Sequence, residues 1–500
     1  MVFTSFQFIL VFLPLAFAGF VLAHRFGGWQ WAINFLAVTS LVFYGMWGAS
    51  LLLVLVGSIF FNYAAGHTIA GLAGNASLAR NALLVSIGTN LGLLGYLKYT
   101  NFLIDIANQA SGAGFAYHDT LVPVGVSFFT FIQIGFLIDA YNGQLIRHNL
   151  ARYIVFSAFF PCVTAGPLVM QKEMMEQLEN PNFSAFELRR VIVGLTMFGM
   201  GLFKKVVLAD SIAPIANQIF DGAANGMTMD ATTAWIGSVS YALQLYFDFS
   251  GYSDMAIGLG AIFGIKLPLN FDSPFKATNI SDFWRRWHMT MTRFFTNYIY
   301  SGLAMNGMRT GAMWHLGSVG RFILVAAMPA IVTFLVAGVW HGSGWTYVIY
   351  GLTHGIAIAT FLAWREFAGI KLPSVVGWAI TMAIVASGLV MFRSVDVATA
   401  TAILQSMWGF GDPVPFAGLD VASALSMITL LGAITQLLPN TQQILHHDWP
   451  TSDVKPSGTE LDAGLLAWRP AFGPALATAA LYTVALTSIG AGSGFLYYKF

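Results

Sequence analysis

Two polar stretches stand out in a chain that is otherwise very apolar, and each contains a histidine. Charged residues make up only 9% of the 500 residues. The first polar stretch spans 248–298 and includes His288, and the second, WHGSGW, spans 340–345 and includes His341. Charge placed among apolar helices is costly and tends to mark function. We therefore expect the two stretches to form one active site.

His341 is the first candidate for a catalytic side chain. It stands between two apolar runs and is followed by Gly342, Ser343 and Gly344. An imidazole can be neutral at physiological pH and act as a general base, and small neighbours leave room for a substrate. A single histidine in a membrane segment is more often structural than catalytic, so both interpretations stay open at this point.

His288 belongs to the stretch SDFWRRWHMTMTRFFTNYIYS at 281–301. Asn279 or Ser281 can cap a helix start, and helical spacing places one group of side chains on a single face, namely Trp284, Trp287, His288, Met291, Phe295 and Tyr298. This pattern predicts an amphipathic helix at the membrane interface, with tryptophans at the level of the lipid headgroups. The alternative is an interfacial helix in which His288 only packs between tryptophans.

Polar side chains also recur within the apolar segment 232–263. Asp248 and Asp254 need partners or water in such surroundings, and Arg285 or Arg286 is a candidate partner. A salt bridge that holds helices together explains the two carboxylates at least as well as a catalytic role. The residues that we expect to contribute to substrate binding are Asp248, Ser250, Tyr252, Asp254, Arg286, Trp340 and Ser343.

The composition is typical of a helical membrane protein. Hydrophobic residues make up 57% of the chain and the mean hydropathy is +0.70, whereas soluble chains carry roughly 25% charged residues. Because a transmembrane helix needs about 20 apolar residues, the runs of this chain predict an all-α polytopic membrane protein. The candidate spans are about 6–23, 31–47, 50–66, 82–106, 120–140, 153–169, 190–208, 232–263, 321–340, 345–364, 375–393, 422–438 and 471–489. Some of them are re-entrant, interfacial or half-length in this interpretation, so we expect about 10–12 crossings.

Two proline-containing segments interrupt the predicted spans. They read PVGVS at 123–127 and PCVTAGP at 161–167. Irregular backbone at membrane depth is tolerated only where it is buried in protein or lines a cavity. Loops just outside the membrane explain the two segments equally well from the sequence alone.

Several function classes are disfavoured by the composition and by missing motifs. A net charge of +1 offers no basic surface for nucleic acid. The single cysteine, Cys162, excludes an internal disulfide and a cysteine-rich metal site, and we expect it to be a buried apolar residue. The sequence has no H-E-x-x-H metal site, no phosphate-binding P-loop and no G-x-S-x-G nucleophile elbow. We therefore expect no metal and no bound cofactor.

The motifs resemble those of the membrane-bound O-acyltransferase family, and within it the group of bacterial alginate O-acetyltransferase membrane subunits. The resemblance covers nearly the whole chain and rests on PVGVSFFTFIQIGFLIDAYNG, GLFKKVVLADSIAP, FDFSGYSDMAIGLGAIFGIKLPLNFDSPFKATNISDFWRRWHMTMTRF, GVWHGSGWTYVIYGLTHG and GFLYYKF. It implies a ring of helices around a central funnel or tunnel. The catalytic histidine of the family's W-H-G motif corresponds to His341, and the second histidine, in the R-W-H motif, corresponds to His288.

The resemblance also implies an enzyme that moves an acyl group, usually acetyl, across the bacterial inner membrane to a hydroxyl. The donor would be a cytoplasmic thioester, either acetyl-CoA or an acyl carrier. The acceptor would be an exported polysaccharide, as in alginate or other exopolysaccharide O-acetylation, or an extracytoplasmic partner protein. His341 would deprotonate the hydroxyl or carry the acyl group covalently, and His288 would position or polarise the acyl carbonyl.

Two alternatives stay open. The related D-alanine-transferring enzymes of teichoic acid synthesis share the two-histidine arrangement, so the motifs do not settle the acyl group. A transporter without group transfer could use Asp248, Asp254 and the histidines as a proton relay, although no inverted repeat of the kind found in many transporters is visible. In each case we predict one membrane-embedded domain over 1–500, with a core at about 120–365 and peripheral helices at 1–110 and 370–500.

Overall fold

The structure is a computed structural model that describes residues 1–119, 121–146, 148–180, 186–411, 414, 416–445, 466–490 and 494–496. Throughout these residues the regular elements are helices, and no strand occurs among them. The end of the GFLYYKF motif, residues 497–500, lies outside the described part. The predicted all-helical fold class is confirmed.

Six helical segments of the described residues are long and apolar enough to cross a membrane: Phe8–Gly45, Ala49–Gly71, Leu188–Ala224, Ser318–His341, Trp345–Ala368 and Ser374–Arg393. Four shorter apolar helices accompany them: Val126–Tyr141, Val397–Met407, Val421–Leu437 and Phe472–Thr487. The chain is therefore a multi-pass membrane protein, and several predicted spans are short helices, as expected for half-length segments.

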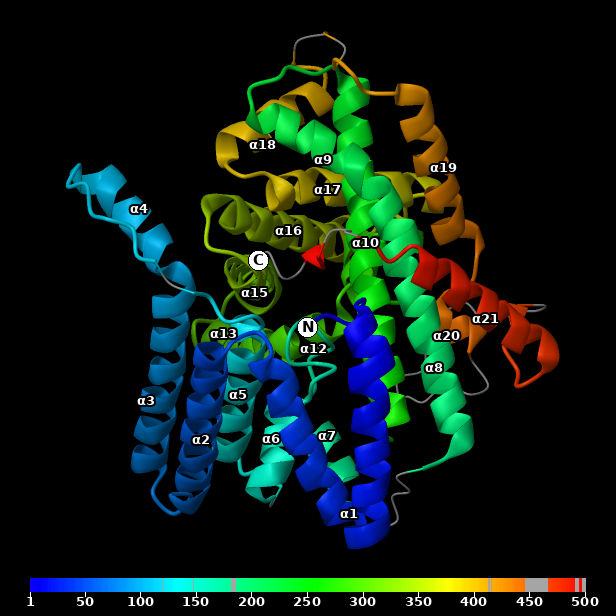
Figure 1. Cartoon of the computed structure of the whole chain (residues 1–500). Helices are drawn as coiled ribbons and strands as arrows, with labels where there is room; N and C mark the ends of the chain where they lie inside the picture. The colour runs from blue at the N-terminus through cyan, green and yellow to red at the C-terminus, as the bar shows by residue number, and fades with distance from the viewer. Residues whose placement is uncertain are drawn as a thin grey trace.

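The first helices form a group at one end of the molecule (Figure 1). They are η1 (Phe8–Phe12), α1 (Leu13–Gly45), α2 (Ala49–Gly71), α3 (Ala76–Leu94), the π-helical turn η2 (Gly95–Tyr99) and α4 (Thr100–Ser111). A φ of 70° at Gly28 bends α1 sharply, so its two arms correspond to the two spans predicted at 6–23 and 31–47. Figure 1 shows α4 extending away from the body beyond the end of α3.

The next elements include one long central helix. They are α5 (Val126–Tyr141), α6 (Leu150–Ala158), α7 (Gln171–Glu179), α8 (Leu188–Phe203), η3 (Lys204–Ala209), α9 (Asp210–Ala224) and α10 (Ala231–Ile262). The elements α8, η3 and α9 pack along α10, whereas α5 packs against α2 and α3. Figure 1 shows α10 running through the middle of the molecule. Its residues are buried along almost the whole length of the helix, because the helix is apolar on nearly every face.

Helices α8 and α10 approach each other so closely that only glycine fits at the contact. A Cβ atom on Gly194 would lie 2.6 Å from the carbonyl oxygen of Gly258, and one on Gly201 would lie 2.5 Å from that of Gly251. Small residues at such contacts let helix backbones pack tightly in a membrane. The carboxylates of α10 are therefore held in a rigid part of the fold.

A buried polar network joins α2, α3 and α5. The side-chain amide of Asn62 donates to Asn90 Oδ1 at 3.0 Å and to Gln133 Oε1 at 2.8 Å, and Asn90 donates back to Asn62 Oδ1 at 2.8 Å. All three side chains are buried. Because interhelical hydrogen bonds in apolar surroundings are worth about 0.6–2 kcal/mol, this network fixes how the first helices meet α5.

The second half of the chain carries the elements around the two histidines. They are η4 (Pro274–Lys276), α11 (Ile280–Arg286), α12 (Met289–Phe295), η5 (Thr296–Tyr300), α13 (Ser301–Met313), α14 (Ser318–Phe322), η6 (Ile323–Ala327), α15 (Met328–His341), α16 (Trp345–Ala363), η7 (Trp364–Ala368) and α17 (Ser374–Arg393). The last described helices are α18 (Val397–Met407), α19 (Val421–Leu437), α20 (Thr441–Ile444) and α21 (Phe472–Thr487).

Candidate active site

The two predicted catalytic histidines come from different elements and lie close together. His341 is the last residue of α15, and His288 immediately precedes α12. Their ring centroids are 6.4 Å apart, and the residues are 5% and 0% exposed, respectively. The structure thus brings together the two polar stretches at these side chains, as the sequence predicted.

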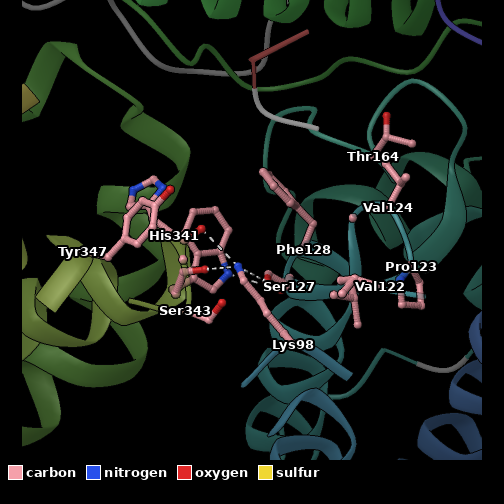
Figure 2. Close-up of a pocket in the computed structure, with 14 residues that line it drawn as sticks. Lys98, Val122, Pro123, Val124, Ser127, Phe128, Thr164, His341, Ser343 and Tyr347 are labelled. Carbon is pink, nitrogen blue, oxygen red and sulfur yellow. Dashed lines mark hydrogen bonds between the residues drawn. The ribbon is translucent and has the colours of Figure 1, made fainter. Parts of the chain in front are cut away.

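His341 lines a cavity with a volume of about 260 Å³. Figure 2 shows its walls, with His341, Ser343 and Tyr347 on one side and Ser127, Phe128 and the Pro123–Val124 segment on the other. The lining comprises Lys98, residues 122–128, Thr164, Trp340, His341, Gly342, Ser343 and Tyr347. The predicted site residues Trp340, His341 and Ser343 are therefore all in the cavity wall.

His288 is not among the residues that line this cavity. Its ring lies behind the wall, 6.0 Å from the ring centroid of Trp340 and 4.8 Å from that of Phe249. Its Nδ1 atom is 2.9 Å from Asn270 Oδ1. His288 therefore supports the site from a buried position next to His341.

The two irregular segments predicted at 123–127 and 161–167 meet at the cavity. Gly125 has a φ of +75°, and a Cβ atom there would lie 2.2 Å from the carbonyl oxygen of Val163. A residue in this left-handed conformation without room for a side chain must be glycine. Ser127 of the first segment and Thr164 of the second line the cavity, which supports the interpretation that these segments form a cavity wall.

Lys98 places an amino group in the cavity wall, and the sequence did not predict this residue as part of the site. It lies in the π-helical turn η2, and its amino group donates to Trp340 O at 2.8 Å, to His341 O at 3.1 Å and to Ser127 Oγ at 3.1 Å. These carbonyls end helix α15, where no intrahelical donor remains for them. Lys98 therefore caps α15 at the end that carries His341 (Figure 2). The sequence did contain a signal, because Lys98 lies inside the predicted span 82–106. An ionisable residue within an apolar span tends to mark function.

The predicted amphipathic helix at 281–301 is wrong in two respects. The Asn279 cap is confirmed, because its side chain accepts from Asp282 N at 2.8 Å. The helix is broken at His288, however, where the backbone is left-handed with φ 45°. Trp284 and Trp287 are only 3% and 5% exposed, so they pack inside the protein instead of facing the headgroups.

The α10 carboxylates pair with lysines of η3, not with Arg285 or Arg286. Lys205 Nζ is 2.7 Å from Asp248 Oδ1, and Lys204 Nζ is 2.6 Å from Asp254 Oδ2. These lysines precede α9 and lie beside α10, whereas the two arginines pair within their own helix α11. Asp282 is 3.1 Å from Arg285 and 3.0 Å from Arg286.

The other predicted binding residues lie outside the cavity lining. Asp248, Ser250 and Asp254 are buried in α10, and Arg286 also donates to Asp272 O at 3.3 Å. Tyr252 does not line the cavity, but its hydroxyl is 2.6 Å from the hydroxyl of Thr164, which does. The ion pairs support the structural interpretation of the carboxylates, and a substrate-binding role for these residues stays a prediction.

The cavity has the parts needed for base-assisted transfer to a hydroxyl. His341 supplies an imidazole, and Ser127, Thr164 and Ser343 supply hydroxyls around it. Within the described part of the chain, no acidic residue lines the cavity. The His341 ring lies among aromatic side chains, because the ring centroids of Trp340 and Phe392 are 4.9 Å and 5.1 Å from its own. Such packing limits the movement of the imidazole, and a general base must be held within reach of the proton that it removes.

Comparison with known proteins identifies relatives across most of the chain. The family model of the membrane-bound O-acyltransferases matches residues 137–391. The peptidoglycan O-acetyltransferase of Helicobacter pylori is 37% identical over 432 residues, which cover 80% of this chain and 79% of the relative. The probable alginate O-acetylase AlgI of Pseudomonas aeruginosa is 34% identical, covering 82% of this chain and 75% of the relative. That of Pseudomonas putida is 31% identical and covers 100% of both chains.

Proposed function

Because the chain belongs to the membrane-bound O-acyltransferase family, we propose that it transfers an acetyl group from a cytoplasmic thioester to a hydroxyl of a cell-envelope polysaccharide. The acetyl donor is acetyl-CoA or an acyl carrier in this proposal. The observation that carries it is His341, which ends α15 in a cavity wall surrounded by hydroxyl-bearing side chains. The relatives support acetyl as the acyl group, since their names specify O-acetylation.

The proposed reaction is a direct acyl transfer at the cavity. His341 removes the proton from the acceptor hydroxyl, and the oxygen attacks the thioester carbonyl. The new C–O bond forms as the C–S bond breaks, and the protonated His341 returns its proton to the departing thiolate. General base catalysis of this kind contributes about 10²–10⁴-fold, and positioning in the cavity supplies the remainder.

The acceptor is the finer part of the proposal. One relative is named for peptidoglycan and two for alginate, and both polymers are polysaccharides with free hydroxyls. We propose a polysaccharide on the outer side of the inner membrane, reached directly or through an extracytoplasmic partner protein.

The test uses cells whose own copy of the gene is replaced by tagged variants. Ester-linked acetate, released from purified polysaccharide by mild alkali, is measured together with ester-linked D-alanine and with the level of tagged protein in the membrane. We expect His341→Ala to remove the acetate while the protein level stays normal. The matched control is His67→Ala, because His67 is exposed on α2.

Three outcomes would contradict the proposal. Normal acetate in the His341→Ala strain would exclude the catalytic role of this histidine. Loss of D-alanine instead of acetate would assign a different acyl group. Substrate uptake by liposomes that contain the purified protein, without consumption of a thioester, would indicate a transporter.

A further inference from the structure

Asn270 is placed to decide which nitrogen of His288 carries the proton. It lies in the segment that follows α10, and its side-chain oxygen Oδ1 is 2.9 Å from His288 Nδ1. Asn270 is 0% exposed, so its partners are fixed by the protein. A neutral imidazole has one N–H donor and one acceptor nitrogen, and the partner of one nitrogen sets the role of the other.

The contacts of Asn270 establish that its oxygen, and not its nitrogen, faces His288. Its Nδ2 donates to Ser253 Oγ at 3.1 Å on the other side. The Thr290 hydroxyl accepts from Leu168 N at 3.0 Å, so its own hydrogen is available for Asn270 Oδ1 at 2.9 Å. The Thr290 backbone N–H also points to Oδ1, at 3.4 Å. An amide nitrogen in this place would face those donors, so the oxygen must be there.

With an oxygen as its partner, His288 Nδ1 must be the protonated nitrogen. The lone pair of the neutral ring is then on Nε2, which can accept a hydrogen bond but cannot donate one. The backbone reinforces this orientation, because Met289 N donates to Asn270 O at 2.9 Å and His288 itself has a left-handed backbone with φ 45°. In this tautomer the single N–H of the neutral ring faces Asn270 Oδ1. A neutral His288 therefore has no second N–H with which to polarise the acyl carbonyl.

We infer that Asn270 is a positioning residue that holds His288 in the Nδ1–H tautomer, so that His288 acts in the transfer as an acceptor next to His341. The inference rests on the function proposed above. His341 becomes positively charged when it takes the proton of the attacking hydroxyl. The lone pair of His288, whose ring centroid is 6.4 Å away, stabilises that charge. His341 would thus be the base and His288 the second group that supports it, as in other sites where a neighbouring group orients the catalytic base.

The experiment compares pH–rate profiles of two Asn270 variants with that of the wild-type protein. Membranes that contain the full chain receive radiolabelled acetyl-CoA and alkali-deacetylated polysaccharide from the same host, and label in the polymer is counted. Asn270→Asp keeps an oxygen that accepts from Nδ1. A carboxylate beside an imidazole favours the charged imidazolium and raises the pKa of the imidazole by about 1–3 units. We therefore expect an active variant whose acidic limb moves to higher pH.

Asn270→Ala removes the acceptor altogether. Loss of the hydrogen bond that orients a metal-binding histidine costs about 10–100-fold, and we expect a fall in rate of the same order here at normal protein level. The matched control is Asn279→Asp, the same chemical change at the cap of α11, where Asp serves equally well. Its pH profile should match that of the wild type.

The outcomes separate this inference from the proposed function. An inactive Asn270→Asp variant at normal protein level would mean that His288 needs the opposite tautomer. A profile identical to the wild type would mean that Asn270 is only structural, and full activity of Asn270→Ala would mean the same. Absence of transfer by the wild-type chain at normal protein level would instead contradict the proposed transfer from acetyl-CoA itself.

Discussion

Lys98 provides the sharpest prediction outside the histidines. Two of its three hydrogen bonds hold the carbonyls of Trp340 and His341, at 2.8 Å and 3.1 Å. Lys98→Met keeps the length and apolar stem of the side chain and removes every donor. Hydrogen bonds to a charged group are worth about 1.5–3 kcal/mol each, and water in the cavity can replace part of this.

We expect Lys98→Met to lower the transfer rate about 100-fold, since a displacement of about 1 Å at a reacting group costs that much. The assay is ester-linked acetate per unit of membrane protein, with the protein's melting temperature measured in detergent. Lys98→Arg should restore part of the activity because it keeps donors and charge. The matched control is Lys172→Met, since the Lys172 side chain is 77% exposed. Wild-type transfer by Lys98→Met at normal protein level would refute the capping argument.

Three further predictions concern the scaffold. Lys205→Met should lower the free energy of unfolding by about 3–5 kcal/mol, because it removes the lysine that pairs with both Asp248 and Asp210 and leaves the buried Asp248 carboxylate without a counter-charge. Adding Asp248→Asn should recover part of the melting temperature, and no recovery would contradict the Asp248 pair as the cause. Gly125→Ala should disrupt the cavity and its transfer activity because its Cβ would lie 2.2 Å from Val163 O, whereas Gly143→Ala, with φ +71° and open space, carries only the left-handed cost of about 1–2 kcal/mol; equal activities would exclude the clash. Asn62→Leu should lower the stability of the purified protein by about 0.6–2 kcal/mol and leave transfer measurable, and an unchanged melting temperature would show that the network adds nothing.

The sequence predicted the fold class and the helices whose signals are local. Long apolar runs predicted α10, α16 and α17 to within a few residues of their ends, because a long run of apolar residues is a local signal for a helix. The breaks at 123–127 and 161–167 were recognised from their prolines, which interrupt a helix locally. Their contact with each other was not, since it joins residues far apart in the chain.

The same limit explains what was missed around the histidines. The helix at 281–301 follows a helical period throughout, and only tertiary packing forces the left-handed turn at His288. The sequence suggested Arg285 or Arg286 as the partner of Asp248. The actual partner is Lys205 of η3, which packs beside α10. No sequence motif predicts the hydrogen bond of Asn270 to His288 or those of Lys98 to the backbone of Trp340 and His341.

Vectorial transfer in proteoliposomes tests the central claim most directly. Vesicles contain the purified chain, or its His341→Ala variant, with alkali-deacetylated polysaccharide enclosed and radiolabelled acetyl-CoA added outside. Wherever the chain faces the added thioester with its cytoplasmic side, we expect label to appear in alkali-labile form on the enclosed polymer with the wild-type chain and not with the variant. Equal labelling with both proteins would contradict the assignment of the transfer to the His341 cavity.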